Sequence, residues 1–533
     1  MKRKVITVFS ALAFCLGTAY SQSMMDAYRY VQSELSGTAR AVSMGGAFGA
    51  LGGDVSVMNI NPAGLAVYRS SEVVTTLSLN MINTKSDWIG TSSSENKTKV
   101  NFDNIAYVGY FPTANEEGLV SWNVGFSYNR LKNYSRDYTA RTSGLDYSMS
   151  DYAAVRANLN GWTGDQLWQT NDYNPYENPE VGDWMSIIAM NSGMIEYDKD
   201  KKSFYSPFAT KDASGGVVPT KITEAIMNIR ESGSVDQYNI AFGANISNFL
   251  MLGAGVDITD LNYNYLSYYN EKFADNSTLT LGTDKGGNGL NTDGTGYSFN
   301  IGAIVNPVNF LRLGVAYTSP TWYKMTDFYY TEASTTVGNS VWTANTPAGA
   351  YSKYEYRTPD KWTFSAAAIL GQVALVSVDY ELMNYKRMRM YDYYGNQNTY
   401  TNGDIQNFMK NSNTLRVGAE VKVTPQFAVR AGASWTQTGM NNDLKNNNVS
   451  VATAGTMPHY NVDLGITNYT VGIGYRFTPR FYADLACVLR SQKEDLYAFS
   501  PIFDEEGQAV VDIQPASLKT KTTRLLLTLG YKF

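Results

Sequence analysis

The chain has 533 residues, with 40 tyrosines, two cysteines, a single histidine and a formal net charge of −5. Mean hydropathy is −0.28, and no internal run of about 18 apolar residues is present, which excludes helical membrane spans. The excess of acidic residues argues against nucleic acid as a partner.

Residues 1–21 read as a secretory signal peptide. A charged start precedes the apolar stretch Val5 to Gly17, and Ala19-Tyr20-Ser21 forms a small-x-small cleavage site. Cleavage after Ser21 removes three of the 43 basic residues and no acidic one, so the mature charge is 40 − 48 = −8. It also leaves Cys487 as the one cysteine, which excludes an internal disulfide.

Residues 22–71 precede the first predicted strand and are rich in glycine. Five glycines fall within nine residues: Gly45, Gly46, Gly49, Gly52 and Gly53. Glycine allows tight turns and close approach of one backbone to another. No Gly-Lys-Ser/Thr follows and no strand precedes, so a phosphate loop and a dinucleotide fold are both disfavoured. The segment reads as a compact coil with a structural role.

About fourteen segments of roughly ten residues then alternate apolar and polar side chains. Leu119 to Arg130 is the clearest, with valine, tryptophan and phenylalanine on one face and serine and asparagine on the other. The predicted strands are Glu72–Ile82, Phe102–Phe111, Leu119–Arg130, Asp236–Ser247, Phe249–Leu261, Gly296–Val305, Asn309–Thr318, Lys361–Gly371, Val373–Met383, Asn413–Thr424, Phe427–Gln437, Asn468–Thr478, Phe481–Arg490 and Thr523–Phe533.

The connections alternate strictly between short and long. Short links such as Asn248, Gln372 and Pro479-Arg480 follow the even strands, and long loops follow the odd ones. This alternation is typical of an up-and-down membrane barrel, whose strands need about 9–11 residues to cross. We therefore predict an all-β outer-membrane barrel over 72–533 in a Gram-negative bacterium, with both chain ends periplasmic.

Such a barrel would leave a wide lumen. Fourteen strands at about 4.8 Å spacing give a backbone diameter of very roughly 28 Å, which side chains alone do not fill. We expect residues 22–71 to act as a plug, since they are neither highly charged nor of low complexity.

The predicted loop 131–235 carries candidate ligand-binding residues. These are Trp162 and Trp168, together with Trp184, Ile187 and Ile188, whose spacing predicts one face of a helix. Ile222, Ile226 and Ile229 have a similar spacing and predict a second helix. The two apolar faces would form either a landing groove for a ligand or the loop's own core.

His459 lies in the predicted loop 438–467 and is a candidate haem ligand, although tyrosine can also ligate haem iron. No serine–aspartate pattern surrounds it, so we do not expect an enzyme. No histidine–cysteine cluster predicts a metal site, and no cofactor is implied.

Three motifs carry a resemblance to a known family. Gly37-Thr-Ala-Arg-Ala41, the run Met44 to Gly52 containing Phe48, and Asn61-Pro62-Ala63 resemble the N-terminal hatch of the FadL/TodX/OmpP1 family of outer-membrane transporters. Thr358 to Trp362 and the terminal Phe533 also look familial, and the latter resembles the signal read by the outer-membrane assembly machinery.

The resemblance implies passive transport of hydrophobic molecules such as long-chain fatty acids. The ligand would bind in the barrel, the hatch would move, and release would occur sideways into outer-membrane lipid. The hatch residues that match are Gly45, Gly46, Phe48, Gly49, Gly52, Asn61, Pro62 and Ala63. The family includes proteins described as haemin receptors, so a haem receptor or a surface adhesin with tyrosine-rich loops remains an alternative, as does a general porin.

Overall fold

The computed structural model describes residues 22–178, 180–211, 217–282, 288–371 and 373–533. The predicted signal peptide 1–21 and the predicted turn residue Gln372 lie outside these ranges.

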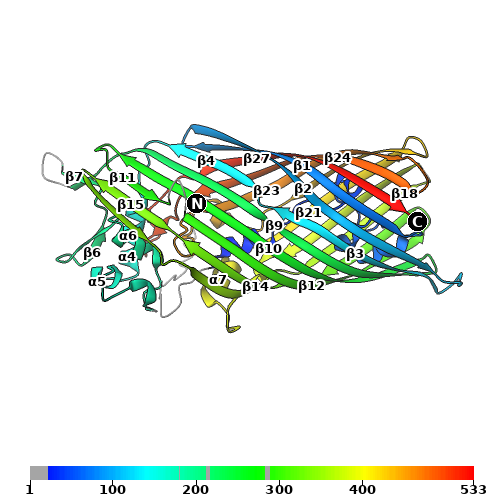
Figure 1. Ribbon diagram of the computed structural model, residues 1–533, viewed down its shortest axis with the longest axis horizontal. Helices are drawn as coiled ribbons and strands as arrows, with labels where there is room; N and C mark the ends of the chain where they lie inside the picture. The colour runs from blue at the N-terminus through cyan, green and yellow to red at the C-terminus, as the bar shows by residue number, and fades with distance from the viewer. Residues whose placement is uncertain (1–21, 179, 212–216, 283–287, 372) are drawn as a thin grey trace.

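Fourteen antiparallel strands form a closed barrel across the described part of the chain (Figure 1). Closure comes from β27, which pairs with β24 on one side and with β1 on the other. The wall strands are β1 (Glu72–Trp88), β2 (Thr91–Pro112), β3 (Leu119–Asn133), β9 (Ile222–Ile246), β10 (Leu250–Phe273), β12 (Asn288–Val308), β13 (Leu311–Thr318), β18 (Lys361–Leu370), β19 (Ala374–Asn384), β21 (Asn411–Lys422), β22 (Phe427–Thr436), β23 (Tyr460–Arg476), β24 (Phe481–Tyr497) and β27 (Ala516–Lys532).

Many strands run well beyond their predicted ends on the long-loop side. β9 begins at Ile222, so the predicted helix over Ile222 to Ile229 is wrong. Ala225, Met227 and Ile229 are buried at every second position, which is the period of a strand. The predicted loop 131–235 is correspondingly shorter, because β3 continues to Asn133 and β4 (Arg136–Thr142) pairs with β9.

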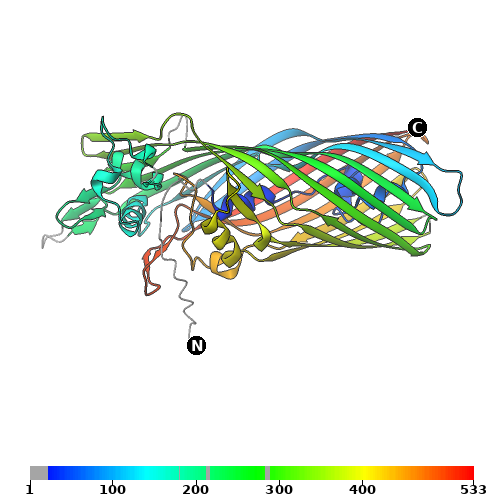
Figure 2. The same ribbon diagram turned by 90° about the horizontal axis from the view of Figure 1, so that it is seen from below.

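These extensions carry a cap at the end of the barrel shown at the left of Figures 1 and 2. The remaining sheet elements are β5 (Glu196–Asp198), β6 (Ser203–Tyr205), β7 (Ala209–Lys211), β8 (Val217–Pro219), β11 (Thr278–Leu281), β14 (Trp322–Tyr330), β15 (Glu332–Val337), β16 (Ser340–Asn345), β17 (Ala350–Arg357), β20 (Arg389–Asp392), β25 (Ile502–Phe503) and β26 (Ala509–Val511). The helices on this side are α4 (Met149–Leu159), α5 (Gly164–Leu167), η2 (Pro175–Glu177), α6 (Trp184–Asn191), η3 (Tyr385–Arg387), α7 (Thr399–Phe408) and α8 (Asn442–Lys445).

The outer wall carries an apolar belt bounded by aromatic side chains. Leu525, Leu527 and Leu529 are exposed on β27, and similar exposed apolar residues follow on the other strands. At one edge of the belt the rings of Phe102, Tyr128 and Tyr238 contact one another, and at the other edge those of Phe111, Trp122 and Phe242 do so. An outward apolar band between two aromatic girdles is the outer surface of a barrel that spans a membrane.

The N-terminal segment lies inside the barrel, where Figure 2 shows its blue helices enclosed by the wall. It consists of α1 (Met24–Val31), α2 (Ala39–Ser43), α3 (Val57–Ile60) and η1 (Pro62–Val67). Nearly every side chain from Ala39 to Ala66 is buried. We call residues 33–67 the plug and treat α1 separately, because α1 lies among the buried tyrosines at the level of the strand extensions.

The two ends of the described chain lie in different places. The Phe533 amide donates to the carbonyl oxygen of Ser71 at 3.0 Å, so the last strand ends beside the start of β1 on the short-turn side. Gln22, in contrast, is hydrogen-bonded to Ser352 and Thr401 on the long-loop side. The expectation that the mature N-terminus is periplasmic is therefore wrong for Gln22. The reason is that the segment between it and β1 runs down through the lumen.

Candidate functional site

The plug is seated on a ring of glycines that face the lumen from eight strands. A Cβ atom built on each of these glycines would lie within 3.0 Å of a plug atom. The set is Gly125, Gly243, Gly253, Gly302, Gly314, Gly418, Gly432 and Gly472. At Gly253, for example, a Cβ would lie 2.2 Å from the Pro62 carbonyl carbon. Sequence reasoning missed this set, although a glycine at an inward position of several neighbouring strands is its signature.

Two of the glycines predicted in the hatch, Gly45 and Gly49, approach the wall closely from the plug side. Gly45 has φ +66°, and a Cβ there would lie 2.7 Å from the Ala433 carbonyl oxygen on β22. Gly46 and Gly52 also have positive φ, which side chains rarely adopt. The amides of Phe48 and Gly49 both donate to the Asp379 carboxylate, at 3.0 and 2.9 Å. The segment thus turns tightly at Gly45 and Gly46, and its backbone then binds the Asp379 carboxylate on the wall.

The motif Asn61-Pro62-Ala63 holds the plug's second half in place. Asn61 is 1% exposed, and its Nδ2 donates to the Gly49 carbonyl oxygen at 2.7 Å and to the Ala303 carbonyl oxygen on β12 at 3.3 Å. Its Oδ1 accepts from the Ala63 amide, which caps η1, and Pro62 occupies the first position of that helix. One amide side chain therefore links two parts of the plug to the wall.

Above the plug, α1 is surrounded by hydroxyls and charges. Ser23 and Asp26 form its capping box. Tyr28 donates to the Asp463 carboxylate at 2.8 Å, and Tyr356 donates to the Ala27 carbonyl oxygen at 2.8 Å. α1 therefore occupies the space that the upper lumen would otherwise offer to a ligand.

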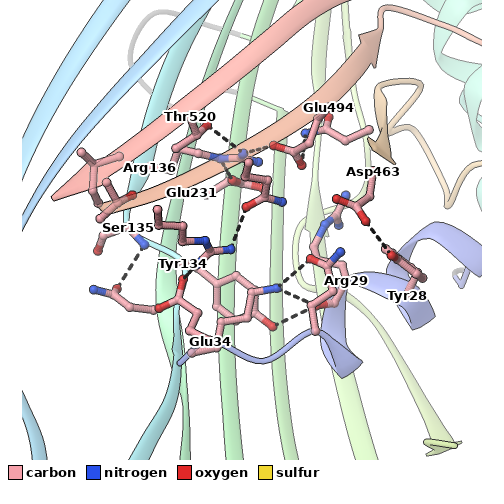
Figure 3. Close-up of a pocket in the computed structure, with 18 of the residues that line it drawn as sticks. Tyr28, Arg29, Glu34, Tyr134, Ser135, Arg136, Glu231, Asp463, Glu494 and Thr520 are labelled. Atoms are coloured by element: carbon pink, nitrogen blue, oxygen red, sulfur yellow. Dashed lines mark hydrogen bonds and ion pairs between the residues drawn. The ribbon is translucent and has the colours of Figure 1, made fainter. Parts of the chain in front are cut away.

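A cavity of about 90 Å³ lies beside α1, and Figure 3 shows residues that line it. Arg136 lies between two carboxylates there, pairing with Glu231 at 2.7 Å and also with Glu494. Arg29 and Glu34 line the same cavity from the N-terminal segment. Ion pairs therefore line this cavity together with apolar side chains such as Met25 and Ile82.

A second cavity of about 180 Å³ lies between the plug and the wall. Leu35 and Ile60 give it an apolar side. Arg416, which pairs with Glu381 at 3.0 Å, also lines this cavity. Ligand pockets usually enclose about 300–1,000 Å³, so neither cavity holds a long apolar molecule while α1 and the plug stay in place.

The wall opens at a seam between β2 and β3. Backbone pairing ends at Asn104 and Asn129, and residues 91–103 of β2 continue without a partner on that side. Side chains bridge the seam instead, including Lys97 to Asp137 at 2.8 Å. At its lower end the Arg524 guanidinium donates to Asp103 and to the Leu35 carbonyl oxygen of the plug, both at 2.7 Å.

The cap places the predicted loop residues in its own core. α6 confirms the helix predicted at Trp184, and Ile187 and Ile188 on it are fully buried. Trp184 contacts Tyr176 edge-on at 5.2 Å between ring centroids. Trp162 is half-buried, and Trp168 is 44% exposed at the surface. The structure therefore does not bring these five residues together in one groove.

His459 is buried, 5% exposed, although the sequence suggested a loop surface. Its Nδ1 lies 2.6 Å from the Ala498 carbonyl oxygen, which can only accept, so Nδ1 carries the proton. Burial lowers the pKa of His459 to about 4, which keeps the ring neutral. The ring packs against Tyr269 at 5.4 Å and lines neither cavity described above.

Within the described ranges, no cluster of three or more histidine, cysteine or acidic residues is arranged to hold a metal ion. None of the helices in the same ranges is long and apolar enough to cross a membrane.

A closed barrel of fourteen strands, with an apolar outer belt and a lumen filled by its own N-terminal segment, defines a plugged outer-membrane barrel. The family model described as outer membrane protein transport protein (OMPP1/FadL/TodX) matches residues 237–498, just under half of the chain. Over these residues the chain is similar to this family, the same one that the hatch motifs resemble.

One solved structure agrees on the fold, and two more are similar to the chain over the same extent. A Pseudomonas aeruginosa FadL homologue superposes with a TM-score of 0.50 at 14% identity, covering 94% of this chain and 99% of the other. The P. putida toluene transporter TodX gives 0.49 at 12% identity, and the Ralstonia pickettii toluene transporter TbuX gives 0.45 at 12%; each covers 94% of this chain and 99% of the other. No curated protein matches the chain.

Proposed function

We propose that this chain carries hydrophobic molecules with a polar head, such as long-chain fatty acids, passively across the outer membrane. Binding in the barrel, movement of the hatch and lateral release are the steps of this proposal. The observation that carries it is the seating of the plug, whose backbone rests on the glycine ring at membrane level. Transport then requires the plug to move, because it fills the lumen.

The contacts between plug and wall favour a removable element. The plug adds no strand to the barrel sheet and is held by separate polar contacts. Examples are the Ala39 amide to Thr528 Oγ1 at 2.7 Å and the Gly45 amide to Thr470 Oγ1 at 3.1 Å. Each such bond contributes about 0.5–1.5 kcal/mol net, so a ligand can replace several of them in sequence.

The seam between β2 and β3 supports a position for the lateral exit. Val100 and Phe102 are exposed on β2 beside it, at the edge of the apolar belt, so a molecule leaving there meets lipid. Arg524 connects the seam to the plug through Asp103 and Leu35. Movement of the plug would therefore remove one of the two hydrogen bonds that hold Arg524 at the seam.

The mixed lining of the second cavity supports an amphiphilic cargo. An acyl chain gains about 0.8 kcal/mol for each CH₂ it buries, and Leu35, Ile60 and Met383 offer apolar contact. Arg416 and Lys361 share Glu381, at 3.0 and 3.6 Å, and a fatty-acid carboxylate would compete for the same cations. A toluene-like molecule has no group for these charges.

The test is a disulfide that locks the plug. A Cβ on Gly49 would lie 3.0 Å from Ser365 Cβ, about half an ångström below the short end of the usual disulfide spacing of about 3.5–4.5 Å. The variant carries Gly49→Cys and Ser365→Cys in a Cys487→Ser background. Once its disulfide has been formed by oxidation, uptake of radiolabelled oleate should be abolished, and a reductant should restore it. Thr84→Cys with Thr520→Cys joins two wall strands, whose hydroxyls are 3.4 Å apart, and serves as the matched control.

Two outcomes would count against the proposal. Full oleate uptake with the cross-link complete by mass spectrometry would exclude plug movement. No oleate uptake by the unmodified barrel, with toluene or haemin taken up instead, would exclude the fatty-acid class.

A further inference from the structure

Four exposed lysines cluster on the outer wall just above the apolar belt. They lie on three neighbouring strands, which run side by side in Figure 1. Lys519 of β27 is directly opposite Lys85 of β1 on one side and Lys493 of β24 on the other. Lys521 lies two residues nearer the membrane, opposite Asn83 and Ser491. We call Lys85, Lys493, Lys519 and Lys521 the lysine cluster.

The cluster has no counter-ion among the described residues. None of its ammonium groups forms an ion pair with a described carboxylate. Asp87 and Asp495 lie two residues farther from the membrane, and Asp87 accepts a hydrogen bond from Ser92. Like charges directly opposite each other destabilise a sheet, so an external anion would stabilise this row of lysines.

The height of the cluster identifies the kind of anion. Lys85, Lys493 and Lys521 each stand four residues above an exposed apolar residue, namely Met81, Leu489 and Leu525. Four residues rise about 13 Å along a strand, or about 10 Å above the belt at the usual tilt. Lipid headgroups begin directly outside the hydrocarbon core, within reach of a lysine side chain that extends toward the interface.

The cluster is confined to one side of the barrel. At a similar height, β9 and β10 carry Asp236 and Asp260 directly opposite each other, and Arg130 pairs with Asp236 at 3.0 Å. The β9–β10 side of the rim therefore differs from the lysine cluster in the sign of its charge. The lysines mark a local surface for a negatively charged partner.

We propose that the lysine cluster binds the phosphate groups of a phosphorylated lipid in the outer leaflet. Two phosphates on one headgroup would contact the lysines of all three strands. They would offset the repulsion between these lysines. Since β27 closes the barrel between β24 and β1, a lipid held there would also brace the closing strand. This surface faces the lipid and lies outside the lumen, so the inference does not depend on the proposed cargo.

The test compares lipid retention by the full chain and by matched variants. The barrel is reconstituted in phosphatidylcholine vesicles containing one part in ten of a bis-phosphorylated glucosamine lipid. It is then extracted in mild detergent, and native mass spectrometry measures how much of this lipid stays bound. Each lysine near an anionic surface contributes about 1 kcal/mol, roughly fivefold in binding. The Lys85→Gln, Lys493→Gln, Lys519→Gln, Lys521→Gln variant should retain the lipid at least about tenfold less than the unmodified barrel.

The control variant removes four exposed lysines of the cap, Lys199, Lys201, Lys202 and Lys221, and should retain lipid like the unmodified barrel. Lys519→Gln alone is the second variant if the fourfold one does not assemble, and it should lower retention severalfold. Equal retention by the cluster variant, or equal loss in the control, would overturn the proposal. So would displacement of the lipid by millimolar inorganic phosphate, or a change of oligomeric state with no change in lipid.

Discussion

Arg524 of the last strand pairs with Asp103 of β2 at 2.7 Å, at the residue where β2 bulges and just beyond the end of its pairing with β3. The other arm of the same guanidinium donates to the Leu35 carbonyl oxygen in the plug. One planar side chain therefore contacts the plug and the seam together, a geometry that a lysine does not reproduce.

Replacing Arg524 by lysine should reduce oleate uptake severalfold while the barrel still assembles. The charge opposite Asp103 is kept, but one of two hydrogen bonds is lost, at about 1.5–3 kcal/mol for a bond to a charged group. Uptake and heat resistance are measured together. Arg156→Lys, which alters an Arg–Asp pair in the cap, is the control and should leave uptake unchanged. Normal uptake in the Arg524 variant would show that the plug and the seam are not coupled through this side chain.

Asn61→Ala should loosen the plug. The substitution leaves the buried Gly49 and Ala303 carbonyls without this donor and removes the cap of η1, for a loss of about 1–3 kcal/mol. We expect larger and more frequent openings in planar-bilayer recordings. Asn59→Ala is the matched control, because the Asn59 side-chain oxygen has no hydrogen-bond partner in the structure. Identical recordings from both variants would show that Asn61 does not hold the plug.

Gly253→Ala should displace the plug from the wall. The new methyl group would lie 2.2 Å from both the Ala63 nitrogen and the Pro62 carbonyl carbon. These are backbone atoms, which cannot move aside as the end of a flexible side chain can. Overpacking of this kind costs about 1–3 kcal/mol, seen as a lower unfolding temperature. Gly289→Ala on β12 is the control. Its new methyl group would lie 3.3 Å from a Leu266 side-chain carbon, and the unfolding temperature should change little. Equal stability of the two variants would argue against a seated plug.

His459 should titrate with a pKa near 4 in the folded protein. As the single histidine, it gives one imidazole signal in an NMR titration. Burial lowers the folded pKa from 6.5 to about 4, so its contribution to stability is complete above pH 6.5 and is lost as pH falls toward 4. The full loss amounts to about 3 kcal/mol. His459→Gln should flatten this pH dependence, whereas a folded pKa near 6.5 would mean that the ring is exposed.

Most of the wall was predictable because membrane strands obey a simple rule. One face must be apolar, so Leu525, Leu527 and Leu529 fall at every second position and reveal the strand. Above the belt this signal ends. The β9 extension faces water outside and a packed core inside, and its isoleucines Ile222, Ile226 and Ile229 matched a helical spacing by coincidence.

The candidate site was only half predictable. The plug's glycines and Asn61 stand close together in the chain, where a motif is visible. Their partners Gly302, Asp379 and Ala303 are hundreds of residues away, and the register of the barrel alone brings them to one level.

By itself, the sequence determined the strand count, the outer-membrane setting and the presence of a glycine-rich segment with no strand of its own. These follow from local alternation and composition, which each stretch of chain carries independently. Tertiary structure alone decided what closes the lumen, where the wall seam lies and which charges meet. Those features depend on closure of the barrel, which sets β1, β24 and β27 side by side and places Arg524 between Asp103 and Leu35.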